Sequence, residues 1–328
     1  MKALVYTGVE RAEIRDVPLP EPEADQVVVN LAFCGLCGSD MHAWHGHDER
    51  RVPPLVLGHE AVGVAENGRL KGQRVAINPL MTCGDCPACL GGREHLCPDR
   101  ELIGMRVPGA FAEKVAIAER NLSPIPDHLS FREAALAEPL ACSVHGVRLA
   151  LEDGAHDPAS SVVILGGGAI GLLAAFVFRD EGLGNIRIAE TSPHRRALLE
   201  DLGLASTYDP RDETPAPDSA DIIYDAVGSK LTRAASSHLA RPGGTIVHIG
   251  LQDSDGGLDT RKLTLQEIRF RGTYCYQERD FAAALDLLAR GIVRGDGWAE
   301  IRPLDDGAGA FMDVHNGTAP PKIILETT

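Results

Sequence analysis

The sequence predicts an α/β protein of two domains: a barrel-like β domain followed by a doubly wound parallel sheet. The first third alternates short apolar runs with turn residues, which is typical of all-β units. Residues 161–274 instead alternate strand-like apolar runs with helical stretches, which indicates parallel strands joined by crossover helices. A chain of 328 residues is also too long for one domain of roughly 100–200 residues.

Composition and charge narrow the class of function. The chain has 44% hydrophobic and 24% charged residues, as in a soluble globular protein. Its net charge of -15 argues against a nucleic-acid partner, because phosphate binding needs clustered Lys and Arg. The N-terminal residues 1–6 turn polar too early for a signal peptide, so we expect a cytoplasmic protein.

One apolar segment resembles a membrane span. Residues 158–178 carry no charge, and Gly167 and Gly171 form a pair of small residues four apart. Three consecutive glycines at 166–168 would weaken a single spanning helix, however, and they also fit a dinucleotide fingerprint. We therefore expect a buried strand followed by a buried helix, and no membrane partner.

The β domain begins with apolar runs at residues 3–6 and 27–31, and Cys34 and Cys37 follow. A Cys-x-x-Cys pair indicates a redox site or half a zinc site. We favour Cys37 because it lies in a glycine-flanked turn, with Ser39 and Asp40 placed to cap the next helix. Cys34 follows an apolar strand and is predicted to be a core thiol.

Four histidines follow this turn. His42, His45 and His47 could form a metal tract, although such residues are more often solvated or lie on a helix face. Only His42 is favoured as functional, because it is close to Cys37 and to the hydroxyl of Ser39. His59, between Gly58 and Glu60, starts a strand-like run, where a lone histidine is usually structural.

The strongest spacing signal is a group of four cysteines. Two successive Cys-x-x-Cys steps and a further cysteine can close a tetrahedral thiolate shell that leaves no position for a substrate. Because nothing indicates secretion, these cysteines are predicted to bind a structural zinc rather than to form disulfides. The alternatives are an iron–sulfur cluster or a chance cluster. The four residues are Cys83, Cys86, Cys89 and Cys97.

The second domain opens with a nucleotide-binding signature. The β-branched run 161–165 is followed by glycines with the G-x-G-x-x-G spacing and then by a helix, an arrangement that places a pyrophosphate at a helix N-terminus. The predicted phosphate-binding residues are Gly166, Gly168, Ala169, Ile170 and Gly171.

The second strand, residues 185–189, ends at Glu190, where a carboxylate would accept the ribose hydroxyls and repel a 2′-phosphate. NAD is therefore favoured over NADP. Arg195 and Arg196 leave NADP possible, because they could pair with a 2′-phosphate or merely cover the adenine. Ligands lie beyond the carboxyl ends of parallel strands, which adds four expected cofactor contacts: Val227, Gly228, Gly250 and Leu251.

The Cys37–Asp40 turn, Gly58–Glu60, the four-cysteine lobe and the glycine fingerprint, in that order, resemble the zinc-dependent medium-chain alcohol dehydrogenases. The resemblance covers essentially the whole chain, and residues 86–97 are most similar to the polyol (sorbitol) and threonine dehydrogenase branch. It implies a GroES-like β-barrel catalytic domain and a Rossmann NAD-binding domain. The implied ranges are 1–142 and 277–328 for the first, with the lobe at about 80–100, and 143–276 for the second.

The resemblance also implies a catalytic zinc on Cys37 and His59, and hence two zinc ions per chain. In this branch a glutamate replaces the further thiolate, and here both Glu60 and Glu138 are candidates. Cys142 lies close to Glu138 in sequence but is interpreted as a packing residue. The segment 66–72 is shorter than the family's hairpin, which leaves the shape of one loop open.

The implied reaction is reversible, NAD-linked oxidation of a secondary or polyhydroxy alcohol by a homodimer or homotetramer. Ser39 would take the hydroxyl proton and His42 would pass it toward solvent. Alternative substrates are 3-hydroxy amino acids such as threonine, or simple alcohols. A more distant alternative is a non-catalytic zinc protein that senses nucleotides, which would not need Ser39 and His42 beside Cys37.

Overall fold

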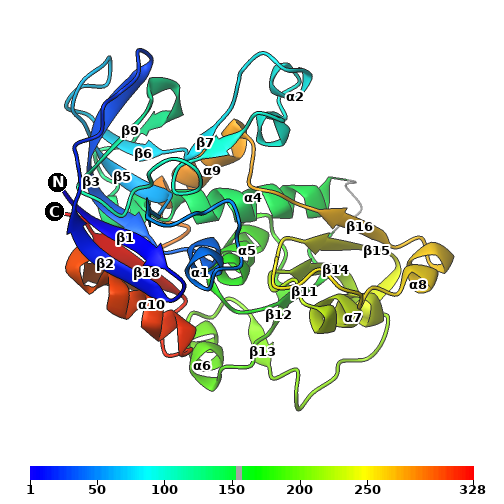
Figure 1. The fold of residues 1–328 in the computed structure, drawn as a ribbon. Helices are drawn as coiled ribbons and strands as arrows, with labels where there is room; N and C mark the ends of the chain where they lie inside the picture. The colour runs from blue at the N-terminus through cyan, green and yellow to red at the C-terminus, as the bar shows by residue number, and fades with distance from the viewer. Residues whose placement is uncertain (153–156) are drawn as a thin grey trace. The chain divides into compact units, whose positions relative to one another are not determined.

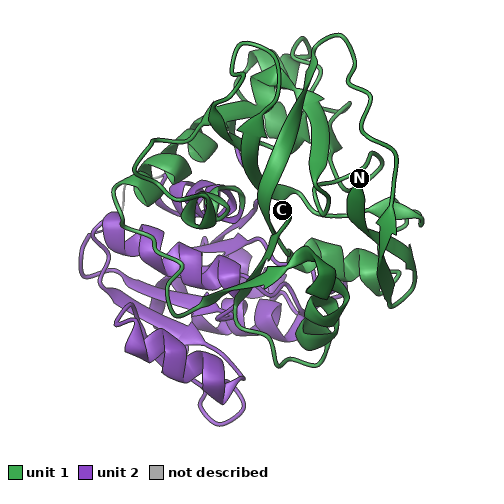
Figure 2. Cartoon of the chain, turned by 90° about the vertical axis from the view of Figure 1, so that its left-hand side faces the viewer, with its two compact units in different colours: residues 1–138, 277–328 green, residues 139–276 purple. Residues whose placement is uncertain are grey.

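The computed structural model describes residues 1–152 and 157–328, which form two compact units (Figures 1 and 2). Unit 1 comprises Met1–Glu138 and Gln277–Thr328, and unit 2 comprises Pro139–Tyr276. Residues 139–142 cluster with unit 2, whereas the sequence-based boundary places them in the first domain. The difference arises because helix α4 (Ala137–Leu151) runs without a break through this boundary.

Unit 1 is built on a seven-stranded sheet completed by the C-terminal segment. The last strand pairs antiparallel with the third strand, so that Ile324 lies opposite Gly35. The strand order is β10-β6-β5-β3-β18-β17, with β9 also paired to β3. Their bounds are β3 (Gln26–Gly35), β5 (Glu60–Ala65), β6 (Arg74–Ile77), β9 (Lys114–Ala118), β10 (Leu122–Pro124), β17 (Ala299–Pro303) and β18 (Lys322–Glu326).

A smaller three-stranded sheet and several helices complete unit 1. Aromatic packing joins distant segments, since Trp44 stacks on Phe311 and Phe311 meets Phe111 edge to face. All three side chains are buried in one apolar core. The elements are β1 (Lys2–Gly8), β2 (Arg11–Asp16), β4 (Leu55–Val56), α1 (Gly38–Trp44), α3 (Phe131–Ala134), α9 (Glu278–Ala289) and α10 (Gly307–His315), with short 3₁₀ turns at Glu119–Asn121 and Leu304–Asp306.

The cysteine-rich lobe projects from unit 1 between two short paired strands. It has almost no apolar core of its own, because its packed cluster consists of Leu80, Leu102 and Met105. Gln277, at the start of α9, donates through Nε2 to the carbonyl of Gly92 (2.7 Å) and thereby ties the lobe to unit 1. The lobe's elements are β7 (Leu80–Met81), α2 (Pro87–Leu90), a 3₁₀ turn (Glu94–Leu96) and β8 (Glu101–Leu102).

Unit 2 is a six-stranded, wholly parallel sheet with the order β13-β12-β11-β14-β15-β16. Helices connect its strands along the chain, except that residues 209–219 join β13 to β14 without a helix. The predicted parallel-sheet fold is therefore confirmed. Residues 158–178 contain one strand and one helix, and no helix in the described parts of the chain is long and apolar enough to cross a membrane. The bounds are β11 (Ser161–Leu165), α5 (Ala169–Asp180), β12 (Asn185–Ala189), α6 (Pro193–Asp201), β13 (Ser206–Tyr208), β14 (Ala220–Asp225), α7 (Lys230–Leu239), β15 (Ala240–His248), α8 (Thr260–Leu265) and β16 (Arg269–Gly272).

Candidate metal centres and cofactor site

Three side chains of metal-ligand type converge in unit 1. Cys37 caps the N-terminus of α1, His59 precedes β5, and Glu60 is the first residue of β5. One ligand atom of each lies within 4.8 Å of the other two. A thiolate, an imidazole and a carboxylate are a donor set that zinc accepts, and three protein ligands leave one coordination position open.

Asp40 orients this group, although the sequence suggested only a helix cap. Its carboxylate accepts hydrogen bonds from the Cys37 N–H (3.0 Å) and the Gly58 N–H (3.3 Å), and it lies 3.5 Å from Nδ1 of His59. The N-cap of α1 is Cys37, and Asp40 occupies the third helical position and reaches back. With Nδ1 facing the Asp40 carboxylate at 3.5 Å, Nε2 of His59 is the nitrogen left for a metal.

Asp40 and His59 are both buried, and each shifts the pKa of the other. Burial opposes charge on both groups, yet the Asp40 carboxylate raises the pKa of His59 well above its ordinary value. Despite its own burial, proximity to His59 correspondingly lowers the pKa of Asp40. Asp40 therefore stays ionised and can hold the imidazole through Nδ1.

Lys322 is a functional candidate that the sequence analysis missed. It is 3% exposed, forms an ion pair with Glu60, and donates to the carbonyl of Leu36 (2.9 Å). Burial opposes its charge, but the Glu60 and Cys37 charges raise the pKa of Lys322. The available signal was a single lysine at the start of the otherwise apolar run Ile323–Leu325.

The two glutamate candidates are placed differently. Glu60 lies within the convergent group, whereas Glu138 is buried in the first turn of α4 and is outside it among the described residues. The Glu138 charge does contribute to raising the pKa of Lys322. Cys142, on the same helix, is also outside the group and belongs to unit 2.

Ser39 and His42 lie three residues apart on α1, the helix that Cys37 caps. Ser39 Oγ is 3.5 Å from Nε2 of His59, and the buried Arg51 donates to both Ser39 Oγ (3.3 Å) and the Ser39 carbonyl (3.2 Å). Within residues 1–152 and 157–328, no hydrogen bond joins Ser39 to His42. Burial lowers the pKa of His42, with His47 and Arg51 adding to the effect, which favours its neutral imidazole.

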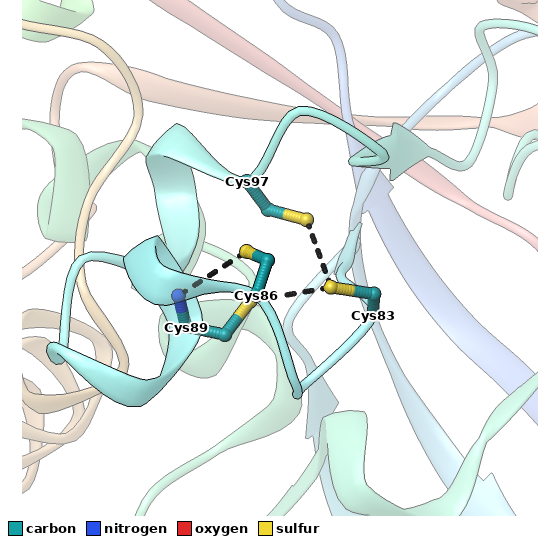
Figure 3. Close-up of side chains that lie close together, drawn as sticks. All are labelled: Cys83, Cys86, Cys89 and Cys97. Carbon is teal, nitrogen blue, oxygen red and sulfur yellow. Dashed lines mark hydrogen bonds between the residues drawn. The ribbon is translucent and has the colours of Figure 1, made fainter.

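The four lobe cysteines face one another (Figure 3). The Cys83 sulfur is 3.5 Å from that of Cys97 and 3.9 Å from that of Cys89, while Cys86 Sγ accepts the Cys89 N–H (3.5 Å). A tetrahedral zinc with Zn–S bonds of about 2.3 Å separates its sulfurs by about 3.8 Å, so the geometry fits zinc. Desolvation raises the pKa of the Cys89 thiol to about 11, so that its thiolate is disfavoured unless a cation stabilises it.

In unit 2, the glycines of the fingerprint have different roles. Gly166 has φ +100, in the left-handed region, and a Cβ on Gly171 would lie 1.9 Å from the Gly166 carbonyl oxygen. Gly168 instead has an ordinary φ of -73 and caps α5, and its Cβ would meet no atom within 4 Å. The fold therefore requires glycine at positions 166 and 171, whereas at 168 only a ligand against the backbone would require it.

Glu190 lies beside this turn, at the end of β12. Its carboxylate is buried and accepts the backbone N–H groups of Gly167 (2.9 Å) and Ser192 (2.7 Å). Arg196 is held by Asp209 (2.9 Å) and by the Glu190 carbonyl. No ion pair or side-chain hydrogen bond engages the Arg195 guanidinium in the described parts of the chain.

The remaining predicted contacts follow β14 and β15. The buried Asp225 accepts the N–H groups of Val227 (3.1 Å) and Gly228 (2.9 Å). A Cβ on Gly228 would lie 2.0 Å from the Gly250 oxygen, so glycine lets these two loops touch. Leu251 is 73% exposed, beyond that contact. These four residues therefore lie together beyond the carboxyl ends of neighbouring strands.

Comparison with known proteins identifies the family of the chain. Residues 23–127 match the family model described as alcohol dehydrogenase GroES-like domain, and residues 169–290 match the one described as zinc-binding dehydrogenase. The chain is 32% identical to the D-arabitol-phosphate dehydrogenase of Enterococcus avium, over 98% of this chain and 95% of the relative. It is 29% identical to the 2-dehydro-3-deoxy-L-galactonate 5-dehydrogenase of Pseudoalteromonas atlantica, over 99% of this chain and 98% of the relative.

Solved structures agree in fold. A Sinorhizobium meliloti 1021 protein assigned to the zinc-binding dehydrogenases, solved with NADP bound, is 30% identical and superposes with a TM-score of 0.87. The match covers 99% of this chain and 98% of that one.

Removing one lobe cysteine should release one metal ion. We expect Cys97→Ser to lose one equivalent of bound zinc per chain and to unfold at a lower temperature, because the lobe has little apolar core without the ion. Zinc is measured by elemental analysis after dialysis, and unfolding by calorimetry. Cys275→Ser, outside the cluster, is the matched control and should retain all zinc. Unchanged zinc content in Cys97→Ser would contradict the assignment.

The two fingerprint glycines should separate stability from cofactor binding. Gly168→Ala should change the free energy of unfolding by less than about 1 kcal/mol yet weaken NADH binding about tenfold, since only the ligand meets its Cβ. Gly171→Ala should destabilise the protein by about 1–3 kcal/mol through its backbone clash, which outweighs alanine's helical preference. Fluorescence titration measures NADH binding, and denaturant unfolding measures the free energy of unfolding. Equal stability losses in the two variants would refute this division of roles.

Replacing one partner of the buried ion pair should lower the free energy of unfolding more than replacing both partners. Lys322→Met leaves the Glu60 carboxylate buried without its cation and should lower the free energy of unfolding by about 3–5 kcal/mol. The double variant Glu60→Gln/Lys322→Met should recover much of that loss. Denaturant unfolding of the wild type, both single variants and the double variant gives the coupling energy. Strictly additive losses would show that the two side chains do not depend on each other.

Proposed function

Because this chain belongs to the zinc-binding dehydrogenases that carry an alcohol dehydrogenase GroES-like domain, we propose that it reversibly oxidises a secondary or polyhydroxy alcohol with NAD. The observation that carries the proposal is the buried group of Cys37, His59 and Glu60, backed by Asp40 and Lys322. A purely structural metal site would need four protein ligands, whereas this group offers three.

Each ligand of this centre is held by an independent contact. Asp40 fixes the imidazole of His59, Lys322 holds the carboxylate of Glu60, and Cys37 stands at the N-terminus of α1. Zinc there would polarise the substrate hydroxyl and lower its pKa, while bound NAD would accept the hydride. We assign Glu60 rather than Glu138 as the third ligand, since Glu60 alone of the two lies in the convergent group among the described residues.

The lobe adds a second, structural zinc on its four cysteines. Its sulfur separations support this proposal, because they match those of a tetrahedral zinc–thiolate shell. We therefore propose two zinc ions per chain. A homodimer or homotetramer is proposed from the family resemblance alone.

The proton would leave through Ser39 and His42. Ser39 Oγ is close to Nε2 of His59 and accepts one hydrogen bond from Arg51 (3.3 Å), which also donates to the Ser39 carbonyl (3.2 Å). His42 is half-buried, and burial lowers its pKa, which favours the neutral imidazole, the form that can accept a proton. Because no hydrogen bond joins the two residues in the described chain, a bridging group such as a ribose hydroxyl of the cofactor is needed between them.

NAD is proposed over NADP because of Glu190. Its buried carboxylate is fixed by two backbone N–H groups at the end of β12, where it would accept ribose hydroxyls and repel a 2′-phosphate. Arg196 is already held by Asp209, which leaves Arg195 as the cation of this pair that could favour NADP. The Sinorhizobium meliloti protein carries NADP, so the choice depends on these residues of this chain.

The substrate class follows from the full-length relatives. Their names describe dehydrogenases of a polyol phosphate and of a deoxy sugar acid, both polyhydroxy compounds. We therefore propose a sugar-derived polyhydroxy alcohol, neutral or anionic, as the substrate of this chain. Threonine and simple aliphatic alcohols remain the alternatives to be tested beside it.

A substrate panel tests the function directly. We expect NADH formation by the zinc-loaded enzyme with at least one polyol, polyol phosphate or sugar acid, and weaker turnover of threonine and simple alcohols. The same panel with NADP should give a lower kcat/KM. Cys37→Ser should lose turnover and one zinc equivalent but retain NADH binding, because Cys37 lies in unit 1 and the fingerprint in unit 2. Near wild-type turnover in Cys37→Ser would overturn the proposed catalytic site.

A further inference from the structure

A second group of metal-ligand side chains lies in unit 1, and neither centre described above uses it. It consists of Glu10, His45 and His315, whose ligand atoms all lie within 4.8 Å of one another. Glu10 lies in the turn between β1 and β2, His45 caps the C-terminus of α1, and His315 is the last residue of α10. Three segments distant in sequence therefore meet at one point.

The two imidazoles are close to metal-binding separation. Nε2 of His45 lies 2.9 Å from Nδ1 of His315, so at most one of these nitrogens carries a proton and the other presents a lone pair. Two imidazole nitrogens bound to one tetrahedral zinc at about 2.0–2.1 Å are separated by about 3.4 Å. A movement of roughly half an ångström, within the reach of side-chain torsions, would convert this contact into ligation.

The surrounding fold holds all three ligands in place. The Glu10 N–H donates to the carbonyl of Trp44 (2.7 Å), which ties the hairpin turn to the end of α1. Gly46 has φ +75, and a Cβ there would lie 2.8 Å from the Val9 side chain, so glycine allows the close approach. The buried Trp44 ring meets both imidazoles edge to face, with centroids at 5.1 Å from His45 and 5.4 Å from His315.

The site is open to solvent, because Glu10 and His315 are exposed and His45 is only partly buried. A cavity of about 480 Å³ borders Glu10 and is lined by Trp44, Arg11 and Met312 among others, but not by the two histidines. Water from the solvent could therefore occupy a fourth position. Two imidazoles and one carboxylate select transition ions such as Zn²⁺ or Cu²⁺ over Mg²⁺ and Ca²⁺, which prefer oxygen donors alone.

From this geometry we propose that Glu10, His45 and His315 form a third metal site, which takes one divalent transition ion per chain. The ion joins the β1–β2 turn to the ends of α1 and α10. It is separate from the proposed catalytic function, since none of its ligands belongs to the Cys37 centre or to the cysteine lobe. The competing interpretation is a plain hydrogen bond between two surface histidines, which binds no ion.

Equilibrium dialysis of the zinc-containing protein against added Zn²⁺, followed by elemental analysis, separates these interpretations. The wild type should hold one more equivalent of zinc than His45→Ala/His315→Ala, and Glu10→Gln should weaken that binding. His194→Ala, which removes an exposed histidine of unit 2, is the matched control and should keep the extra equivalent. Equal zinc content in the wild type and the double variant would overturn the proposal.

A spectroscopic measurement keeps the test independent of stoichiometry. Cu²⁺ added to the wild type should give an electron paramagnetic resonance spectrum with nitrogen hyperfine structure from two imidazoles. His315→Ala should lose one of these nitrogens, while its NADH-forming activity and its tightly bound zinc show that the variant is folded. An unchanged copper spectrum in His315→Ala would exclude His315 as a ligand and refute the site.

Discussion

The buried ion pair between Glu60 and Lys322 is the interaction on which unit 1 depends. Its two residues come from β5 and from β18, so one charge pair joins the N-terminal strands to the last strand of the chain. A buried charge without a partner is strongly unfavourable, so neither residue can be placed without the other. Gly35 also keeps the space open, since a Cβ there would lie 2.0 Å from the Glu60 carboxylate.

Single buried carboxylates also organise the turns at other candidate sites in both units. Asp40 is shared between the Cys37 and Gly58 N–H groups and His59, and Asp225 is shared between the Val227 and Gly228 N–H groups in unit 2. In both places a buried carboxylate gathers backbone donors from a turn that must keep one shape. Loops that would otherwise be mobile are therefore fixed where a metal or a dinucleotide is proposed to bind.

Much of the fold could be predicted from the sequence, because strand and helix periodicity and turn residues are local signals. The parallel sheet of unit 2 was predicted from alternating apolar runs and is confirmed, as is the family. The positioning residues Asp40, Arg51 and Lys322 were not identified as functional. Asp40 looked like a helix cap, whereas Lys322 and Arg51 belong to none of the motifs found in the sequence. Their roles depend on partners that lie elsewhere in the chain.

The sequence alone determined which residues could act as ligands, because cysteine, histidine and glutamate are recognisable by chemistry and their spacing marks the lobe and the fingerprint. Tertiary structure decided which of them meet. It brought Glu60 to Cys37 and His59 while leaving Glu138 outside that group of described residues, and it placed His45 beside His315. Spacing along a chain specifies local geometry, whereas a metal-binding group needs atoms from several strands and helices within a few ångströms, and only the packed fold supplies that.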